Sequence, residues 1–108
     1  MTKPAIHPDM QILAKARAPA GMFDSSIEGQ RAAWDYYAKG MYRAPPADMK
    51  VADHSVGGEG GSIAVRVYRP ADAPAAGAPA VLYMHGGGFM KGDLDSSETV
   101  AWGFADQV

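Results

Sequence analysis

Two stretches near the start of the chain repeat apolar residues at the spacing of an α-helix. The first runs from Pro8 to about Arg17, with the proline suited to an opening turn. In the second, Ser25 and Glu28 have the spacing of a capping box, and Gly40 is the expected stop. The apolar faces would comprise Met10, Leu13 and Ala14 in the first helix, and Ile27, Trp34, Ala38 and Met41 in the second.

An alternating pattern follows the two helical stretches. Met49–Val56 is a strand candidate, and in Ser62–Arg69 the apolar residues Ile63, Val65 and Val67 occupy every second position. The glycine-rich residues 57–61 would form a five-residue loop between the two strands. The pattern therefore predicts an antiparallel hairpin, and the residues 70–79, which are rich in alanine and proline, predict a loop after it.

Ala80–Met84 is a continuous apolar run between a proline and a glycine cluster. Such a run is typical of a strand that is buried on both faces in a parallel sheet. Beyond the glycines, Asp95 and Glu98 have the spacing of an N-terminal helix cap. No stop signal precedes Val108, so the helix is expected to continue to that residue. Its apolar face would comprise Val100, Phe104 and Val108, with Ala101 and Ala105 beside them.

Composition narrows the functional classes. The 108 residues are 47% hydrophobic with a net charge of -2, which argues against wholesale disorder, nucleic-acid binding and attraction to an anionic membrane. The chain has no cysteine, and His7, His54 and His85 lack metal-ligand spacing, so neither disulfide nor metal site is expected. With no signal peptide and no run of about 20 apolar residues, we expect a cytoplasmic protein that does not enter a membrane.

The glycine cluster carries the chemistry that the sequence suggests. In His85-Gly86-Gly87-Gly88-Phe89, three glycines let the backbone approach a substrate, and their N–H groups can face one concavity. A loop of this kind between a strand and a helix can donate hydrogen bonds to a developing oxyanion. Two alternatives are a purely structural turn and a phosphate-binding loop. The phosphate motifs fail because Gly92 follows Lys91, and because Lys91 itself stands at the last glycine position.

A longer run supports the first interpretation. It comprises Val65-Arg66-Val67-Tyr68-Arg69-Pro70, then Val81-Leu82-Tyr83-Met84-His85-Gly86-Gly87-Gly88-Phe89 and Gly92-Asp93-Leu94-Asp95. This run resembles the bacterial esterases similar to hormone-sensitive lipase, which have the α/β-hydrolase fold. The resemblance implies that Gly87 and Gly88 donate backbone N–H groups to the oxyanion while Gly86 permits the turn. It also implies that His85 braces the loop and Phe89 lines the substrate pocket, with an ester substrate and no cofactor or metal.

The same resemblance implies the organisation of the chain. Residues 1–43 would form two cap helices, and residues 44–108 the hairpin, one buried parallel strand, the oxyanion loop and the first core helix of an incomplete α/β-hydrolase sheet. In that sheet the strand before the oxyanion loop lies between two later strands, so Ala80–Met84 would have no ladder partner within this chain.

The catalytic residues of that family are missing from this sequence. Its nucleophilic serine stands in G-x-S-x-G, followed by an acid and a histidine, and no such motif occurs here. Ser62 is not a candidate, because it opens a strand-like run and precedes the glycine loop. We expect the chain alone to be inactive, with the rest of the hydrolase domain supplied in cis or as a second chain. An inactive remnant or a ligand-binding module is the alternative.

Overall fold

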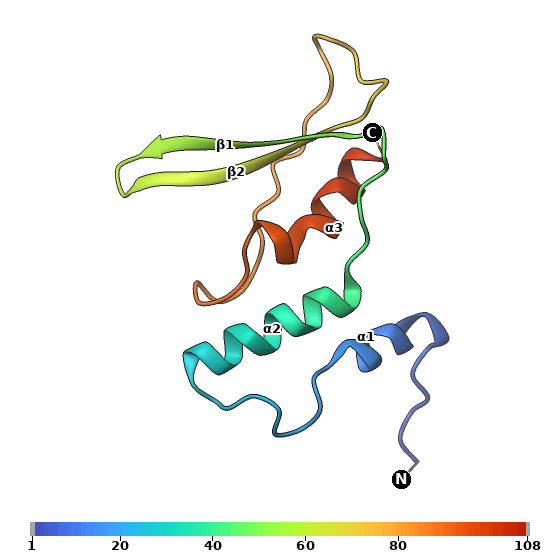
Figure 1. The fold of residues 1–108 in the computed structure, drawn as a ribbon. Helices are drawn as coiled ribbons and strands as arrows, with labels where there is room; N and C mark the ends of the chain where they lie inside the picture. The colour runs from blue at the N-terminus through green and yellow to red at the C-terminus, as the bar shows by residue number, and fades with distance from the viewer. Residues whose placement is uncertain (1, 108) are drawn as a thin grey trace.

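The computed structural model describes residues 2–107. The elements are η1 (Pro8–Met10), α1 (Gln11–Ala16), α2 (Ile27–Met41), β1 (Lys50–Gly58), β2 (Gly61–Arg69) and α3 (Leu94–Ala105). The β1–β2 hairpin contacts α3, which contacts α2, which in turn contacts α1. Figure 1 shows this series from the hairpin at one end of the molecule to the N-terminal helices at the other. The mixture of helices with a two-stranded antiparallel sheet is compatible with part of an α/β fold.

The two N-terminal helices pack at a point where both residues are small. Ala16 is 5% exposed, and a Cβ added to Gly40 would lie 3.0 Å from the Ala16 Cβ. Gly40 therefore does not end the second helix, as the sequence predicts, but lies inside α2 where it lets α1 approach. The predicted face of the first helix is confirmed only at Leu13, which is half-buried, because Met10 and Ala14 are exposed.

The N-terminus of α2 is capped one residue later than predicted. The Ser26 hydroxyl accepts a hydrogen bond from the Gly29 N–H at 3.0 Å, while Asp24 Oδ1 accepts one from the Ser26 N–H at 3.0 Å. The hydroxyl of Ser26 also lowers the pKa of Asp24 by donating a hydrogen bond to its carboxylate. The predicted capping box of Ser25 and Glu28 is wrong because this Asp24 turn shifts the helix start to Ile27.

The hairpin is confirmed, with a shorter turn than predicted. The ladder extends as far as the pair Gly58 and Gly61, so that only Glu59 and Gly60 connect the strands. The prediction of a five-residue loop is wrong because Gly57, Gly58 and Gly61 belong to the ladder. Their backbone N–H and C=O groups can thereby pair across the hairpin. All of β1 is exposed, and the hairpin covers no extensive core.

The apolar run at residues 80–84 is neither a strand nor buried. Leu82 is 84% exposed and Met84 is 79% exposed, and the run has no ladder within residues 2–107. The predicted burial is wrong because no strand within residues 2–107 pairs with the run. Tyr83 packs on the Phe104 ring of α3, with 5.8 Å between ring centres, but this contact does not cover Leu82 or Met84.

The helix after the glycines begins with a different cap and ends earlier than predicted. Asp93 accepts a hydrogen bond from the Ser96 N–H at 2.8 Å, and the Ser96 hydroxyl accepts one from the Asp93 N–H at 2.9 Å. This reciprocal pair replaces the predicted pair of Asp95 and Glu98, which bond instead to the hairpin. The helix ends at Ala105, so the prediction that it continues towards Val108 is wrong for residues 106 and 107. Val108 itself lies outside the described residues. Of the predicted apolar face, Val100 and Phe104 remain 49% and 46% exposed.

The described residues bury little apolar surface. Among residues 2–107, only Ala16 and Met49 are buried apolar residues. The radius of gyration is 17.1 Å, against about 13 Å for a compact domain of this length. The accessible surface is 8596 Å², against about 5800 Å² for a folded monomer of this mass. This arrangement therefore lacks the core that would stabilise an independent domain. Among residues 2–107, no helix has the length and apolar character needed to cross a membrane.

Candidate functional site

The glycine cluster forms a tight turn between the extended residues 80–86 and α3 (Figure 1). The Gly87 carbonyl accepts hydrogen bonds from the N–H groups of Met90 and Lys91, at 3.1 Å and 3.2 Å. Three successive residues have positive φ: Gly87 at 150°, Gly88 at 62° and Phe89 at 58°. An alanine Cβ at Gly87 would overlap the Lys91 carbonyl. At Phe89, which has a Cβ, the left-handed conformation costs about 1–2 kcal/mol.

The turn leaves the successive backbone N–H groups of residues 86–89 without an acceptor within residues 2–107. Over residues 2–107, neither the Gly87 N–H nor the Gly88 N–H donates a hydrogen bond. Gly86, before them, has neither a positive φ nor a neighbour within 4 Å of an added Cβ. The conformational demand for glycine therefore falls on Gly87 and Gly88, and both can donate to an oxygen of another molecule.

His85 and Phe89 flank the turn in different ways. The His85 Nδ1 lies 2.9 Å from the Gly86 carbonyl, and its ring lies so close to Gly92 that an added Cβ there would be 2.7 Å from Nδ1. Gly92 has φ 98°, which also favours glycine. The His85 ring thus lies between the two ends of the turn. The Phe89 side chain is fully exposed and lies outside the groove described below.

The start of α3 is anchored directly after the turn. The carboxylate of Asp93 caps the helix, and the hydrogen bond from the Ser96 backbone N–H lowers the pKa of Asp93. The cap is thus strongest with Asp93 ionised, and a negative charge at a helix N-terminus is itself favourable.

A cluster centred on Arg66 joins the hairpin to α3. Its guanidinium pairs with both carboxylate oxygens of Asp53, at 2.6 Å and 3.0 Å, and with Asp95 Oδ1 at 2.8 Å. Glu98 lies 3.4 Å from the same group and accepts a hydrogen bond from the Tyr68 hydroxyl at 3.2 Å. The bond from Arg66 lowers the pKa of Asp53, whereas burial first, and then the charge of Glu98, raise the pKa of Tyr68 to about 12. The cluster fixes the hairpin on α3.

The helix α2 contacts the glycine turn at Met90 and Lys91. Arg31 Nε donates a hydrogen bond to the Met90 carbonyl at 2.6 Å, and Lys91 Nζ lies 5.2 Å from the centre of the Trp34 ring. The sequence predicted neither contact. The partners Arg31 and Met90 are 59 positions apart, and no local motif marks such a separation.

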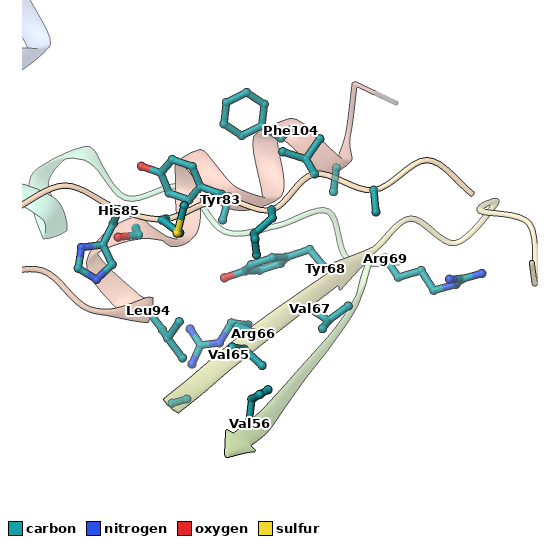
Figure 2. Close-up of a pocket in the computed structure, with 18 of the residues that line it drawn as sticks. Val56, Val65, Arg66, Val67, Tyr68, Arg69, Tyr83, His85, Leu94 and Phe104 are labelled. Atoms are coloured by element: carbon teal, nitrogen blue, oxygen red, sulfur yellow. The ribbon is translucent and has the colours of Figure 1, made fainter. Parts of the chain in front are cut away.

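An apolar groove of about 1020 Å³ lies between the hairpin, the run 80–84 and α3. Figure 2 shows that its lining comes from all three: Val65 and Val67 belong to β2, Tyr83 to the extended run, and Phe104 to α3. The apolar side chains that the sequence assigns to a sheet core face this groove.

No triad can be assembled from the described residues. Ser62 lies in β2 opposite Gly57, beside the hairpin turn, as its strand context predicts. His54 is exposed in β1, and His7 accepts a hydrogen bond from the Asp9 N–H. Among residues 2–107 no cluster of three histidine, cysteine or acidic side chains could hold a metal ion.

Two curated proteins are similar to this chain. Esterase LipI of Mycobacterium tuberculosis is 37% identical over 98 residues, which cover 89% of this chain and 29% of that protein. Ethyl acetate hydrolase of Pseudomonas putida is 48% identical over 51 residues, or 46% of this chain and 16% of that protein. Both names denote ester hydrolysis. The chain spans less than a third of the length of either relative.

The similarity supports an origin in a family of esterases and lipases. No protein-family model matches the chain, and no solved structure is significantly similar to it. Hydrolase ancestry is therefore supported by the sequence similarity alone.

Proposed function

We propose that this chain is the N-terminal part of a serine carboxylesterase or lipase similar to hormone-sensitive lipase. In this proposal Gly87 and Gly88 donate their N–H groups to the oxyanion that forms when a serine attacks an ester carbonyl. The observation that carries the proposal is the turn itself. Its two positive-φ glycines present successive N–H groups that make no hydrogen bond within residues 2–107. The two relatives named for ester hydrolysis support the same chemistry.

The other residues of the turn have supporting roles. His85, whose Nδ1 lies beside the Gly86 carbonyl, braces the turn and does not act as the catalytic base. Phe89, with its exposed side chain, becomes part of the substrate pocket once the rest of the domain surrounds it. The helices in residues 1–43 form part of a cap over that pocket.

The partner in this proposal is the remainder of the hydrolase domain, joined to the chain or supplied as a second chain. Its docking surface is the apolar groove. One side of the groove is β2, which has β1 as its only hydrogen-bonded neighbour within residues 2–107, and the other is the unpaired run 80–84. An extended apolar segment between them would satisfy backbone groups on both sides, and each such group costs about 1–3 kcal/mol when buried unpaired. Similarity to less than a third of each relative is consistent with such a missing partner.

The test is labelling with a fluorophosphonate, which reacts with activated serines, followed by intact-mass analysis. The chain by itself should take up no label, because Ser62 lies in a strand with no base beside it. Joined to or mixed with the remaining sequence of its parent, the preparation should take up one label, outside residues 1–108. Failure of the complete protein to react would contradict the esterase and favour an inactive remnant or a ligand-binding module. An adduct on Ser62 would also overturn the proposal.

A further inference from the structure

The contact between α2 and the glycine turn carries a further inference, which rests on the proposed function. The Met90 carbonyl accepts the 2.6 Å hydrogen bond from Arg31, and the N–H of the same peptide unit, that of Lys91, donates to the Gly87 carbonyl at 3.2 Å. One peptide plane is therefore held at both ends, by a side chain of α2 and by the backbone of the turn. A planar trans peptide held at both ends has little freedom to rotate.

The same constraint continues to the next peptide plane. The Gly87 carbonyl, which accepts from Met90 and Lys91, belongs to the peptide unit whose N–H is that of Gly88. In a trans peptide the C=O and the N–H point in opposite directions. Holding the Gly87 carbonyl towards residues 90 and 91 therefore directs the Gly88 N–H away from them. Two hydrogen bonds thus connect the Arg31 guanidinium to the orientation of one proposed oxyanion donor.

A second contact supports the same connection. Trp34 is three positions after Arg31, so both side chains leave the same face of α2. The Lys91 ammonium lies 5.2 Å from the Trp34 ring centre, within the range of a cation–π interaction. Adjacent residues of the turn are thus held by adjacent turns of one helix. The bond from Arg31 is charge-assisted, which makes it the stronger of the two contacts.

We propose that Arg31 is a positioning residue for the oxyanion donors: it orients the Gly88 N–H through the Met90–Lys91 and Gly87–Gly88 peptide planes. Trp34 supports it through Lys91. Because α2 is one of the proposed cap helices, a movement of the cap would reorient the donor. The position of the cap and the readiness of the oxyanion site are then coupled.

The test compares Arg31→Met, which keeps the length of the side chain without its charge or donors, with Arg31→Lys, which keeps a cationic donor. Lys39→Met serves as the matched control, since it removes a positive charge from the last turn of α2, away from the glycine turn. Each variant is made in the chain joined to or mixed with the remaining parent sequence. The substrate is a short-chain p-nitrophenyl ester, and backbone amide exchange is followed in the same samples.

We expect Arg31→Met to lower kcat about tenfold or more with KM nearly unchanged, because the negative charge on the oxygen is absent from the bound ester and develops only on the way to the tetrahedral intermediate. Arg31→Lys should recover part of the loss, and Lys39→Met should retain the parent values. The Lys91 amide should exchange several-fold faster in Arg31→Met, because its peptide plane has lost one anchor. A rise in KM alone, or an equal loss in Lys39→Met, would overturn the positioning role.

Amide exchange separates this inference from the proposed function. Unchanged exchange at Lys91 in Arg31→Met would overturn the inference even in an active esterase. If the parent protein neither hydrolyses esters nor binds fluorophosphonate, the proposed function is overturned, even when Lys91 exchanges faster in Arg31→Met. Arg31 would then be an anchor of a turn without catalytic consequence.

Discussion

Glycine gathers twice in this chain, at residues 57–61 and at residues 86–88, and the two clusters take different conformations. In the first, Gly57 and Gly58 continue the β1 ladder, and only Gly61 has a positive φ, 115°. In the second, Gly87 and Gly88 both have positive φ, and an added Cβ on Gly87 would overlap the Lys91 carbonyl. The hairpin uses glycine as ordinary strand residues and one turn residue, whereas the second cluster needs it for a close backbone approach.

The partners of the two clusters explain this difference. The hairpin cluster is bonded only to its neighbours in sequence, through β1 and β2. The second cluster is held by Arg31 from α2, 59 positions before Met90, and is followed by the Asp93 cap of α3. A glycine-rich sequence therefore does not by itself distinguish a hairpin turn from a binding site. What distinguishes the two is which distant side chains fix the backbone and which N–H groups remain without acceptors.

The strongest test of this comparison is one substitution in each cluster. Gly87→Ala places a methyl group against the Lys91 carbonyl and strains a φ of 150°, so the turn must rearrange. Under the proposed function we expect kcat of the complete protein to fall about 100-fold or more, the typical effect of losing one oxyanion donor. Gly60→Ala, with no atom within 4 Å and no positive φ, is the matched control and should leave kcat unchanged. Equal losses in both variants would remove the distinction between the clusters.

A smaller effect is expected at the one strained glycine of the hairpin. Gly61→Ala forces a Cβ onto a φ of 115°, which should destabilise the turn by about 1–2 kcal/mol. The loss should appear as faster amide exchange across the β1–β2 ladder, with no change at Lys91. The control is Gly57→Ala, which has open space and an ordinary strand conformation. Faster exchange at Lys91 in Gly61→Ala would show that the two clusters are coupled, contrary to their separate contacts.

The smallest effect is expected when the pH is lowered. It concerns the carboxylates of Asp53, beside the hairpin, and Asp93, beside the glycine turn. The pKa values of Asp53, which holds the hairpin to Arg66, and of Asp93, which caps α3 after the turn, are both lowered from 3.8. A carboxyl with a depressed folded pKa stabilises the fold above its unfolded pKa and loses that contribution as pH falls through the folded value. Both contacts should therefore be intact above about pH 4 and weaken below it. For the Asp93 cap the expected loss of stability is about 1 kcal/mol, the typical contribution of an N-cap.

Carboxyl chemical shifts of Asp53 and Asp93, with the amide shift of Ser96, measure this transition. The Ser96 amide should move together with the Asp93 carboxyl, since it donates to that group at 2.8 Å. Asp93→Asn retains a capping oxygen without the charge and should remove the pH dependence at Ser96. A Ser96 shift that ignores the Asp93 titration would contradict the cap.

The sequence predicted the elements better than their ends and their burial. Helices near 8–17 and 27–41, the hairpin and the helix after the glycines all occur. The cap of α2 was displaced by Asp24, and Gly40 proved to be a packing position. Periodicity reports which face of a segment is apolar, but capping and close approach depend on the three-dimensional placement of a few atoms.

The candidate site shows the same division. The glycine cluster was found from its residues alone, because few residues other than glycine tolerate such backbone angles. The anchors Arg31 and Trp34 were not found, because an exposed arginine and a helical tryptophan carry no signal of a partner far along the chain. The run 80–84 was recognised as apolar, but its burial needs a neighbour that residues 2–107 do not supply.

The sequence by itself determined the local structures of this protein: two amphipathic helices, a hairpin, an apolar run and a glycine turn followed by a helix. Each depends on contacts within about ten to twenty residues, which composition and spacing can encode. The tertiary structure decided the direction of the Gly88 N–H, the attachment of the hairpin through Arg66 and the exposure of residues 80–84. These depend on atoms brought together from distant positions, because only the folded chain determines which backbone groups are paired and which remain without an acceptor.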